Sequence, residues 1–382
     1  MPTQTIDAAI VGGGIAGAWA LNILRSRGYN AVLVESKALG CGQTLASQGM
    51  IHGGLKYALS GMVTGASEAI ADMPARWRAC LRGEDEVDLR DTALLSEHYY
   101  MFAAGSARGR FTTFFASRAL RGRIEKVGKA DWPQAFDGFD GALYALNDFV
   151  IDTSALMHTL TSAHRDRIFS LRADAHSIRA ANDGGFLIEL TDQTLHAAQL
   201  INCAGCGSEA LLEQLRIADL RVQHRPLKQV IVRPRHRVSM YAHCLTGITG
   251  NEPRLTITTH SQDDSCVWYL GGQLATTGVT RSDAEQLQFA QQELRACVPW
   301  LDWDDAVYSV CAIDRAEPRQ GSGLKPDQAF VSRVGDFVQC FPVKLTLAPD
   351  LGDRLLAVLD PPRHPGEITS AHARAAIGAP PW

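Results

Sequence analysis

The first forty residues alternate between short apolar runs and one amphipathic stretch. Residues 6–11 (IDAAIV) predict a buried strand, and a glycine cluster follows at once. From Ile15 to about Arg27 the apolar positions recur at helical spacing, and Gly28 is placed to end that helix. Residues 31–35 (AVLVE) then predict a second buried strand. This order of elements indicates the first unit of an α/β fold with parallel strands.

Later segments repeat the pattern of an apolar strand that ends in glycine. Residues 197–215 (AAQLINCAGCGSEALLEQL) predict a strand that ends near Cys203, Ala204 and Gly205, and then a helix from Ser208. Three apolar runs further on predict antiparallel strands, namely KQVIVRP, RLTITTH and CVWYLGGQL. The chain therefore combines a parallel α/β part with an antiparallel part.

Composition narrows the class of protein. The chain has 382 residues, of which 46% are hydrophobic and 20% charged, as in ordinary globular proteins. A net charge of −4 gives no general attraction for nucleic acid. The sequence has no apolar run near the roughly 20 residues that a membrane-spanning helix needs, and its start lacks the pattern of a secretory signal. Nine scattered cysteines do not suggest a disulfide framework, so we expect a cytoplasmic protein.

Cys203 and Cys206 form a C-x-x-C pair, which has three interpretations. It could be a redox pair or half of a metal site. A metal site normally needs a second pair or closely spaced histidines, and none follows in the sequence. Packing of both cysteines around a tight turn is therefore favoured, and we expect no bound metal.

The glycine cluster carries the clearest chemical signal. Gly12, Gly14 and Gly17 form G-x-G-x-x-G between the predicted strand and helix, and Glu35 follows about twenty residues later. Such glycines let the backbone approach a pyrophosphate, and the acid can accept a ribose hydroxyl, which disfavours NADP. Regular βαβ units do not follow the second strand, and a second glycine-ended strand comes far downstream. A long cofactor, FAD rather than NAD, fits this arrangement better.

Several stretches together resemble the FAD-dependent D-amino acid oxidase superfamily, namely VGGGIAGAWAL with VLVE, INCAG, and the segment from about Cys311. Residues 51–57 (IHGGLKY) resemble the I-H-G-G-(Leu/Val)-R-Y motif of flavin-dependent glycerol-3-phosphate dehydrogenases. They are also similar to the I-H-(Ala/Ser)-G-Ile-Y-Y stretch of L-2-hydroxyglutarate oxidases. VKLTLAPDLG resembles the G-G-K-L-T-T segment of the dehydrogenases, but Pro342 and Val343 replace its glycine pair. The resemblance therefore supports FAD more strongly than glycerol 3-phosphate.

The resemblance implies an α/β fold with two interleaved domains. A discontinuous Rossmann-like FAD-binding domain would comprise residues 1–89, 146–221 and 313–382. An antiparallel-sheet substrate domain would comprise residues 90–145 and 222–312. Cofactor contacts are implied for Gly12, Gly14, Ile15, Ala16, Gly17, Glu35, Ser36, Thr44, Ala46, Ser47, Gln48, Gly49, Ala175, Cys203, Ala204, Gly205, Lys344, Leu345 and Thr346.

The resemblance also implies catalytic positions at His52, Lys56, Tyr57, Arg315 and Lys344. His52 has three interpretations: a substrate or acid–base residue, a covalent flavin link, or a structural histidine. Lys56 stands where the dehydrogenases carry arginine, so its charge is kept but bidentate recognition is lost. Together, Lys56, Arg315 and Lys344 would place three positive charges at the site, which would favour an anionic substrate. His260, Tyr269 and Gln273, on or beside the predicted antiparallel strands, are further candidates.

We therefore expect an enzyme that oxidises a small anionic substrate at a CH–OH carbon, a 2-hydroxy acid or a compound like glycerol 3-phosphate. Amine oxidation of the D-amino acid, glycine or sarcosine type is an alternative, and so is a flavin-binding protein without turnover. Oxygen or quinone would accept the electrons. The basic stretch 108–129 predicts either a helix at the inner face of a membrane or a helix that packs its phenylalanines inward.

Overall fold

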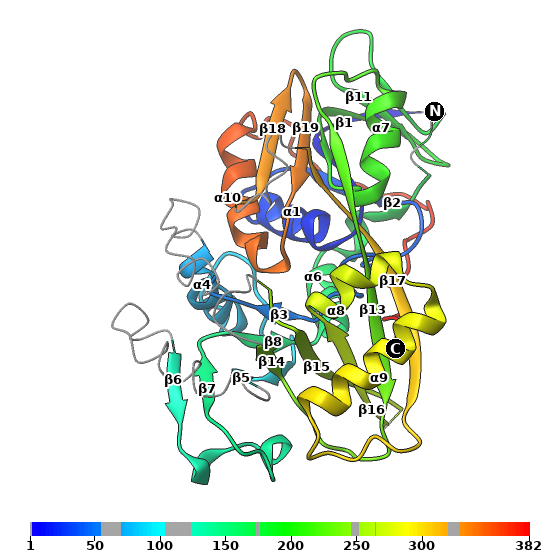
Figure 1. The fold of residues 1–382 in the computed structure, drawn as a ribbon. Helices are drawn as coiled ribbons and strands as arrows, with labels where there is room; N and C mark the ends of the chain where they lie inside the picture. The colour runs from blue at the N-terminus through cyan, green and yellow to red at the C-terminus, as the bar shows by residue number, and fades with distance from the viewer. Residues whose placement is uncertain are drawn as a thin grey trace.

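A computed structural model describes residues 2–54, 70–103, 124–172, 174, 176–245, 252–263, 265–319 and 328–382. Within these ranges, the strands form two eight-stranded sheets and one three-stranded sheet. The two large sheets occupy the upper and lower parts of the molecule (Figure 1). The predicted α/β fold, with a Rossmann-like part and an antiparallel-sheet part, is confirmed.

The first sheet has a parallel centre. Its parallel strands, in spatial order, are β9 (Ile168–Ser170), β2 (Ala31–Glu35), β1 (Thr3–Val11), β12 (Thr194–Asn202) and β19 (Phe337–Phe341). The antiparallel strands β10 (Ile178–Ala180) and β11 (Phe186–Glu189) extend it beside β12, and β18 (Phe330–Val334) pairs with β19. Strand β1 is covered on both faces, which explains why its sequence is a continuous apolar run.

Helices cover both faces of this sheet. On one face, α1 (Ile15–Ser26), α4 (Met73–Leu81), α6 (Thr153–Ser162) and α10 (Ala348–Val358) share one apolar core with the sheet. On the other face, α7 (Ser208–Gln214) contributes Leu211 and Leu212 to the apolar core that also contains Ala9 and Val11. Helix α1 ends where the sequence predicts, because Gly28 adopts a φ of +82° and donates its N–H to the Arg25 carbonyl.

The second sheet is antiparallel except for one pair. Its strands, in spatial order, are β17 (Val307–Pro318), β13 (Val222–Arg233), β16 (Ser265–Gly271), β15 (Leu255–Gln262), β14 (Ala242–Leu245), β5 (Tyr99–Ala103), β7 (Leu143–Leu146) and β6 (Ile124–Val127). Only β14 and β5 run parallel among these described strands. Helices α8 (Gln273–Thr277) and α9 (Asp283–Cys297) pack on one face, and a capping box of Ser282 and Glu285 starts α9.

A long two-stranded ribbon belongs to the second sheet and reaches toward the first. All twelve residues of β13 pair with all twelve of β17. Strand β17 runs through the predicted domain boundary at residues 312 and 313, so the exact division stays a prediction. The third sheet, formed by β3 (Met50–Ile51), β8 (Phe149–Ile151) and β4 (Leu94–Ser96), carries the segment before His52.

Short 3₁₀ turns complete the described secondary structure. They are η3 (Lys129–Asp131), η4 (Gln134–Phe136), η5 (Arg165–Arg167), η6 (Gly205–Gly207), η7 (Gly278–Thr280) and η8 (Leu345–Leu347). Of the basic stretch 108–129, residues 108–123 lie outside the described part, and its end forms β6 and the start of η3. Among the described helices, none has both the length and the apolar character to cross a membrane.

The close packing of Gly17, in the first turn of α1, against Gly12 predicts the effect of adding one methyl group at position 17. A Cβ on Gly17 would lie 1.9 Å from the Gly12 carbonyl oxygen, so Gly17→Ala must displace backbone. We expect a loss of about 1–3 kcal/mol in the free energy of unfolding, measured by chemical denaturation. The matched variant Gly207→Ala meets only an ordinary contact at 3.5 Å and should change stability little. Equal stability of the two variants would contradict this packing argument.

Candidate functional site

The turn after β1 touches the end of β12 backbone to backbone. Gly12 has a φ of +105°, and a Cβ there would lie 2.5 Å from the Cys203 carbonyl oxygen and 2.6 Å from the Cα of Ala204. The Cys203 N–H donates to the Val11 carbonyl at 2.8 Å. Glycine is therefore required at position 12, and the two strand ends that sequence analysis assigned to one cofactor lie side by side.

The amino terminus of α1 opens beside this turn. Its N-cap, Gly14, has no side chain to cap the helix, and Thr44 Oγ1 accepts the Ile15 N–H at 2.9 Å. Thr44 is thus a buried residue at the start of the helix, and its predicted contact with a cofactor stays a prediction. The other first-turn residues, Ala16 and Gly17, present backbone N–H groups and the positive end of the helix dipole. Such an end suits an anion.

Glu35 lies at the carboxyl end of β2, directly against the glycine turn. Its carboxylate accepts the Gly13 N–H at 2.7 Å and the Lys37 N–H at 2.7 Å. Each carboxylate oxygen keeps a further lone pair, so these bonds leave acceptor capacity for a hydroxyl group. Ser36, the next residue, is exposed.

Residues 46–49 join the two large sheets. The Tyr269 hydroxyl of β16 lies 3.0 Å from the Ala46 carbonyl oxygen and 3.0 Å from Gln229 Oε1 of β13. Gln48 Nε2 donates to the carbonyls of Tyr269 at 2.9 Å and Thr256 at 3.1 Å. Gln48, predicted as a cofactor contact, therefore directs its amide at the second sheet. Burial raises the pKa of Tyr269, which remains a neutral hydrogen-bonding group.

The neighbouring positions of this loop are fixed by backbone contacts. Gly49 adopts a φ of +66°, and a Cβ there would lie 2.1 Å from the Ile151 carbonyl oxygen. The Ser47 hydroxyl lies 3.4 Å from the Gly49 N–H, which donates to it. These contacts determine where the loop enters β3, and with it the position of the His52 backbone.

His52, Gly53 and Thr346 come together from distant parts of the sequence. The His52 N–H donates to Thr346 Oγ1 at 3.1 Å, and the fully buried Trp77 donates its indole N–H to the Thr346 carbonyl at 2.8 Å. Gly54 has a φ of +70°. A Cβ on Gly53 would meet only ordinary contacts, with the Pro74 Cγ nearest at 3.5 Å. Within the described chain, packing therefore does not require glycine at position 53.

A buried carboxylate that sequence analysis missed holds this segment. Asp148 Oδ1 accepts the Gly53 N–H at 2.9 Å, and the side chain is 5% exposed. Burial raises the pKa of Asp148 to about 6, although the Gly53 hydrogen bond opposes the shift. The sequence around it, LNDFV, contains no motif, and Asp148 is 95 residues from its partner. Only the fold identifies it.

Arg315 lies on the face of the β13–β17 ribbon that also carries Gln229 and Cys311. The register pairs Arg225 with Arg315 and Gln229 with Cys311. Arg225 forms an ion pair with Glu317 at 3.0 Å, whereas Arg315 donates only to the Arg225 carbonyl at 3.3 Å. In the part of the chain that the structure describes, Arg315 has no carboxylate in ion-pair contact. Burial and the charge of Arg225 lower its pKa, yet a guanidinium stays charged.

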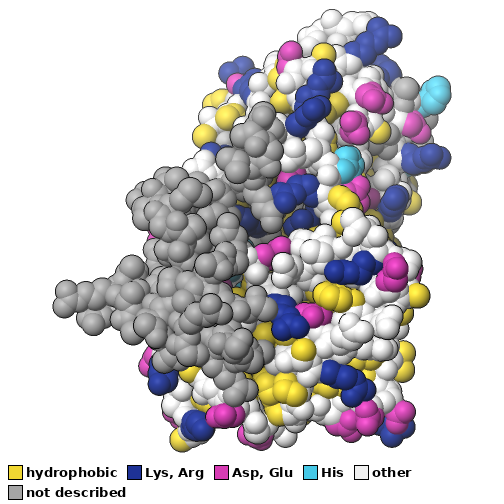
Figure 2. Space-filling model, viewed as in Figure 1, with side chains coloured by type: hydrophobic (Ala, Val, Ile, Leu, Met, Phe, Trp, Pro, Cys, Tyr) yellow, Lys and Arg dark blue, Asp and Glu magenta, His cyan; other side chains and the backbone are white. Residues whose placement is uncertain are grey.

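Lys and Arg side chains gather where the upper and lower parts of the molecule meet (Figure 2). Lys344 begins the η8 turn next to Thr346 and follows Val343, which has a φ of +64°. The left-handed conformation is rare for a β-branched residue such as valine. It occurs at the position where the G-G-K-L-T-T segment of the glycerol-3-phosphate dehydrogenases carries glycine. The backbone at Val343 is therefore locally strained.

The remaining predicted residues fall into three groups. Lys56, Tyr57 and Ala175 lie outside the described residues. His260 and Tyr269 are buried, and His260 stacks on Trp382 with ring centroids 3.9 Å apart. Burial lowers the pKa of His260 to about 3, so it is neutral. Gln273 is exposed at the start of α8, and Leu345 is partly buried in η8.

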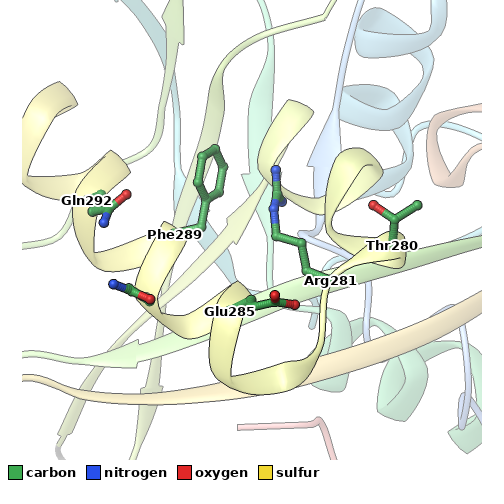
Figure 3. Close-up of a pocket in the computed structure, with 6 residues that line it drawn as sticks. Thr280, Arg281, Glu285, Phe289 and Gln292 are labelled. Carbon is green, nitrogen blue, oxygen red and sulfur yellow. The ribbon is translucent and has the colours of Figure 1, made fainter.

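A cavity of ≈ 360 Å³ lies elsewhere, between η7 and α9 (Figure 3). None of its lining residues is a predicted site residue: they are Thr280, Arg281, Glu285, Gln288, Phe289 and Gln292. The Arg281 guanidinium already lies 3.8 Å from the Phe289 ring centroid and donates to Gln286 and Thr277. Arg281 therefore already has hydrogen-bond partners. Because the cavity is lined by none of the predicted site residues, it is not part of the site around the glycine turn.

Comparison with known proteins identifies the family. The model of the DAO family, described as FAD dependent oxidoreductase, matches residues 7–333. A Pseudomonas aeruginosa protein named "Probable FAD-dependent oxidoreductase PA4991" is 43% identical over 388 residues, which cover 98% of this chain and 97% of that protein. Glycerol-3-phosphate dehydrogenase 1 of Mycobacterium tuberculosis is 28% identical over 57% of this chain and 45% of its own length.

Solved structures agree with the sequence comparison. The crystal structure of PA4991 from Pseudomonas aeruginosa superimposes with a TM-score of 0.84 at 37% identity, covering 100% of this chain and 99% of that one. Glycine oxidase from Geobacillus kaustophilus gives a TM-score of 0.62 at 18% identity, covering 98% and 100%. L-alpha-glycerophosphate oxidase from Mycoplasma pneumoniae gives 0.63 at 15% identity, covering 99% and 100%. The last two similarities concern the fold alone.

The buried Asp148 predicts a pH dependence of stability. Its folded pKa of about 6 lies above the ordinary 3.8, so the folded protein binds this proton more tightly than the unfolded chain does. The stability of the native protein relative to Asp148→Asn should therefore fall by about 2–3 kcal/mol as pH rises from 4 to 7. Denaturant unfolding of both proteins at each pH measures this difference. A difference that is constant with pH would contradict the raised pKa.

Proposed function

The chain belongs to the DAO family of FAD-dependent oxidoreductases, and we propose that it oxidises a small anionic substrate at a carbon that carries a hydroxyl group. A 2-hydroxy acid or a compound like glycerol 3-phosphate has the required chemistry. When bound, FAD supplies the acceptor for the hydride that leaves this carbon. The observation that carries the proposal is Arg315, a half-buried guanidinium without a carboxylate in ion-pair contact among the described residues.

Several features of the chain fit FAD. Gly12 allows close backbone approach, the first turn of α1 offers N–H groups to a pyrophosphate, and Glu35 keeps acceptor capacity for a ribose hydroxyl. We propose that Thr44, the 46–49 loop, Cys203 to Gly205, and Lys344 to Thr346 complete the site. Gly53, which packing does not require, would leave room for a flat ring system beside the loop.

Arg315 would hold the anionic group of the substrate. A guanidinium that forms no direct ion pair in a partly desolvated position attracts a carboxylate or phosphate, and its fork can bind either one through two parallel bonds. Arg225 cannot compete for the same role, because Glu317 neutralises it at 3.0 Å. Lys344 and Lys56 would add positive charge. Oxygen or a quinone would take up the electrons afterwards.

His52 would accept the hydroxyl proton. Its backbone is held through the hydrogen bond to Thr346, and the next N–H is held by Asp148, so the imidazole starts from a fixed position. Neutral imidazole is a suitable base near physiological pH, and a positioned base accelerates proton transfer. The segment around it, IHGGLKY, resembles enzymes that act on alcohols, whereas the glycine oxidase fold neighbour keeps amine oxidation as the alternative.

Anaerobic flavin bleaching tests the substrate class. The yellow protein should lose its visible flavin absorbance when mixed with a 2-hydroxy acid or glycerol 3-phosphate, and not with the matching uncharged alcohols. Arg315→Met should raise the half-saturating concentration by at least about 30-fold, because losing one partner of a buried charge pair costs about 2–5 kcal/mol. Arg315→Lys should have a half-saturating concentration between those of the native protein and Arg315→Met.

The exposed Arg295 on α9 provides a matched control. Arg295→Met should leave both flavin content and saturation unchanged. Bleaching by D-amino acids, glycine or sarcosine alone would replace the alcohol proposal by amine oxidation. If the half-saturating substrate concentration were unchanged in Arg315→Met, Arg315 would not belong to the substrate site.

Substitution of His52 tests its role. His52→Asn should slow flavin reduction by about 10²–10⁴-fold while FAD content stays the same, and the rise of the rate with pH should disappear. Stopped-flow absorbance over a pH series measures both effects, with His158→Asn, an exposed histidine of α6, as the control. If denatured native protein retains FAD and denatured His52→Asn releases it, His52 is a covalent link instead.

A further inference from the structure

Three side chains with metal-binding groups meet on the opposite face of the ribbon from Arg315. Cys206 of η6, His224 of β13 and Asp314 of β17 each offer one donor atom, and these atoms all lie within 4.8 Å of one another. His224 Nδ1 lies 2.6 Å from Asp314 Oδ2, and the Cys206 thiol donates to the Asp314 carbonyl at 3.1 Å. All three residues are exposed. The donors are therefore accessible to an ion from solvent.

The strand register explains why His224 and Asp314 meet. Asp314 pairs with Pro226, and His224 pairs with Ala316, so the two are diagonal neighbours on one face of the antiparallel ribbon. Alternation along the strands turns Arg225 and Arg315 to the other face. The cluster is thus separate from the surface assigned to the anionic substrate.

A second carboxylate, from the helix that follows η6, lies beside the other nitrogen of the His224 ring. Glu209 of α7 places Oε2 at 3.7 Å from His224 Nε2. Cys206 and Glu209 lie in the segment that follows β12, a strand of the first sheet. His224 and Asp314 lie on strands of the second sheet. The four side chains therefore come from both large sheets and meet at the point where these sheets are joined.

We propose that Cys206, His224 and Asp314 bind a Zn²⁺ ion, with a water molecule in the fourth position. Sulfur, imidazole nitrogen and carboxylate oxygen together match the ligand preference of Zn²⁺ better than that of Mg²⁺ or Ca²⁺. Tetrahedral coordination at the usual bond lengths separates ligand atoms by roughly 3.3–3.6 Å. The present separations, from 2.6 Å to 4.8 Å, bracket that range, so small movements of exposed side chains suffice.

The local charge favours a cation. The carboxylates of Asp314 and Glu209 lie 2.6 Å and 3.7 Å from the two ring nitrogens of His224, and their negative charge attracts a metal ion. Without metal, the thiol proton and the His224–Asp314 hydrogen bond satisfy the cluster. Binding would release the thiol proton and replace that hydrogen bond, so zinc affinity should decrease as pH falls.

Zinc titration tests the site in the FAD-containing protein. After dialysis against a chelator, the protein should take up one equivalent of added ZnCl₂ in competition with a chromophoric chelator and keep it through gel filtration. Cys206→Ser and His224→Gln should each lower the affinity by more than about tenfold, since even outer-sphere changes have effects of that size. Cys41→Ser removes the other exposed cysteine and should bind zinc like the native protein.

Alkylation mapping gives a second measurement on the unmodified protein. Zn²⁺ should protect Cys206 from iodoacetamide and leave Cys41 as reactive as before, which peptide mass spectrometry detects separately. Asp314→Asn can keep a hydrogen bond to His224, so it should fold with a native flavin spectrum and yet bind zinc more weakly. The proposal would be overturned if the native protein bound no stoichiometric zinc, or if Cys206→Ser and His224→Gln bound zinc with native affinity. Equal alkylation of Cys206 with and without Zn²⁺ would also overturn it.

Discussion

The close contact between the Gly12 turn and the end of β12 is the constraint on which the rest of the structure depends. It requires a residue without Cβ at position 12, with backbone atoms of Cys203 and Ala204 about 2.5 Å from where that atom would be. This contact aligns β1 with β12, and both strand ends then open at the same edge of the sheet. The amino terminus of α1, Glu35 and Thr44 all take their positions from that edge. The cofactor region is thus a consequence of how two strands approach each other.

The site is assembled at a junction, because the loop between β2 and β3 is held from both sides. Its beginning supports α1 through Thr44, and its middle binds the second sheet through Ala46 and Gln48. Directly after β3, Thr346 and Asp148 hold the N–H groups of His52 and Gly53. Hydrogen bonds from three directions leave this loop little freedom, which is the arrangement that a precisely positioned imidazole at His52 would need.

Local sequence patterns predicted the features that depend on neighbouring residues. The glycine turn, the end of α1 at Gly28, and the strands β1, β2 and β12 follow from spacing and conformational preference. Asp148 could not be predicted, because its role depends on burial next to Gly53, far away in the sequence. The face of a strand was equally undetermined. Tyr269 is buried, with its hydroxyl at the Ala46 carbonyl, and His224 meets Asp314 only through the β13–β17 register.

The strand order of the first sheet has a consequence for how the chain folds. Strand β1 needs β12 as a neighbour, β12 needs β19, and Leu39 is bridged to Ile377 beside the same sheet. A ribosome must therefore release the chain as far as Asn202, more than half of its 382 residues, before the first strand can complete its hydrogen bonds. Such long-range pairing slows folding and leaves apolar strands exposed meanwhile, so this protein should depend on chaperones more than a protein of similar size with local contacts.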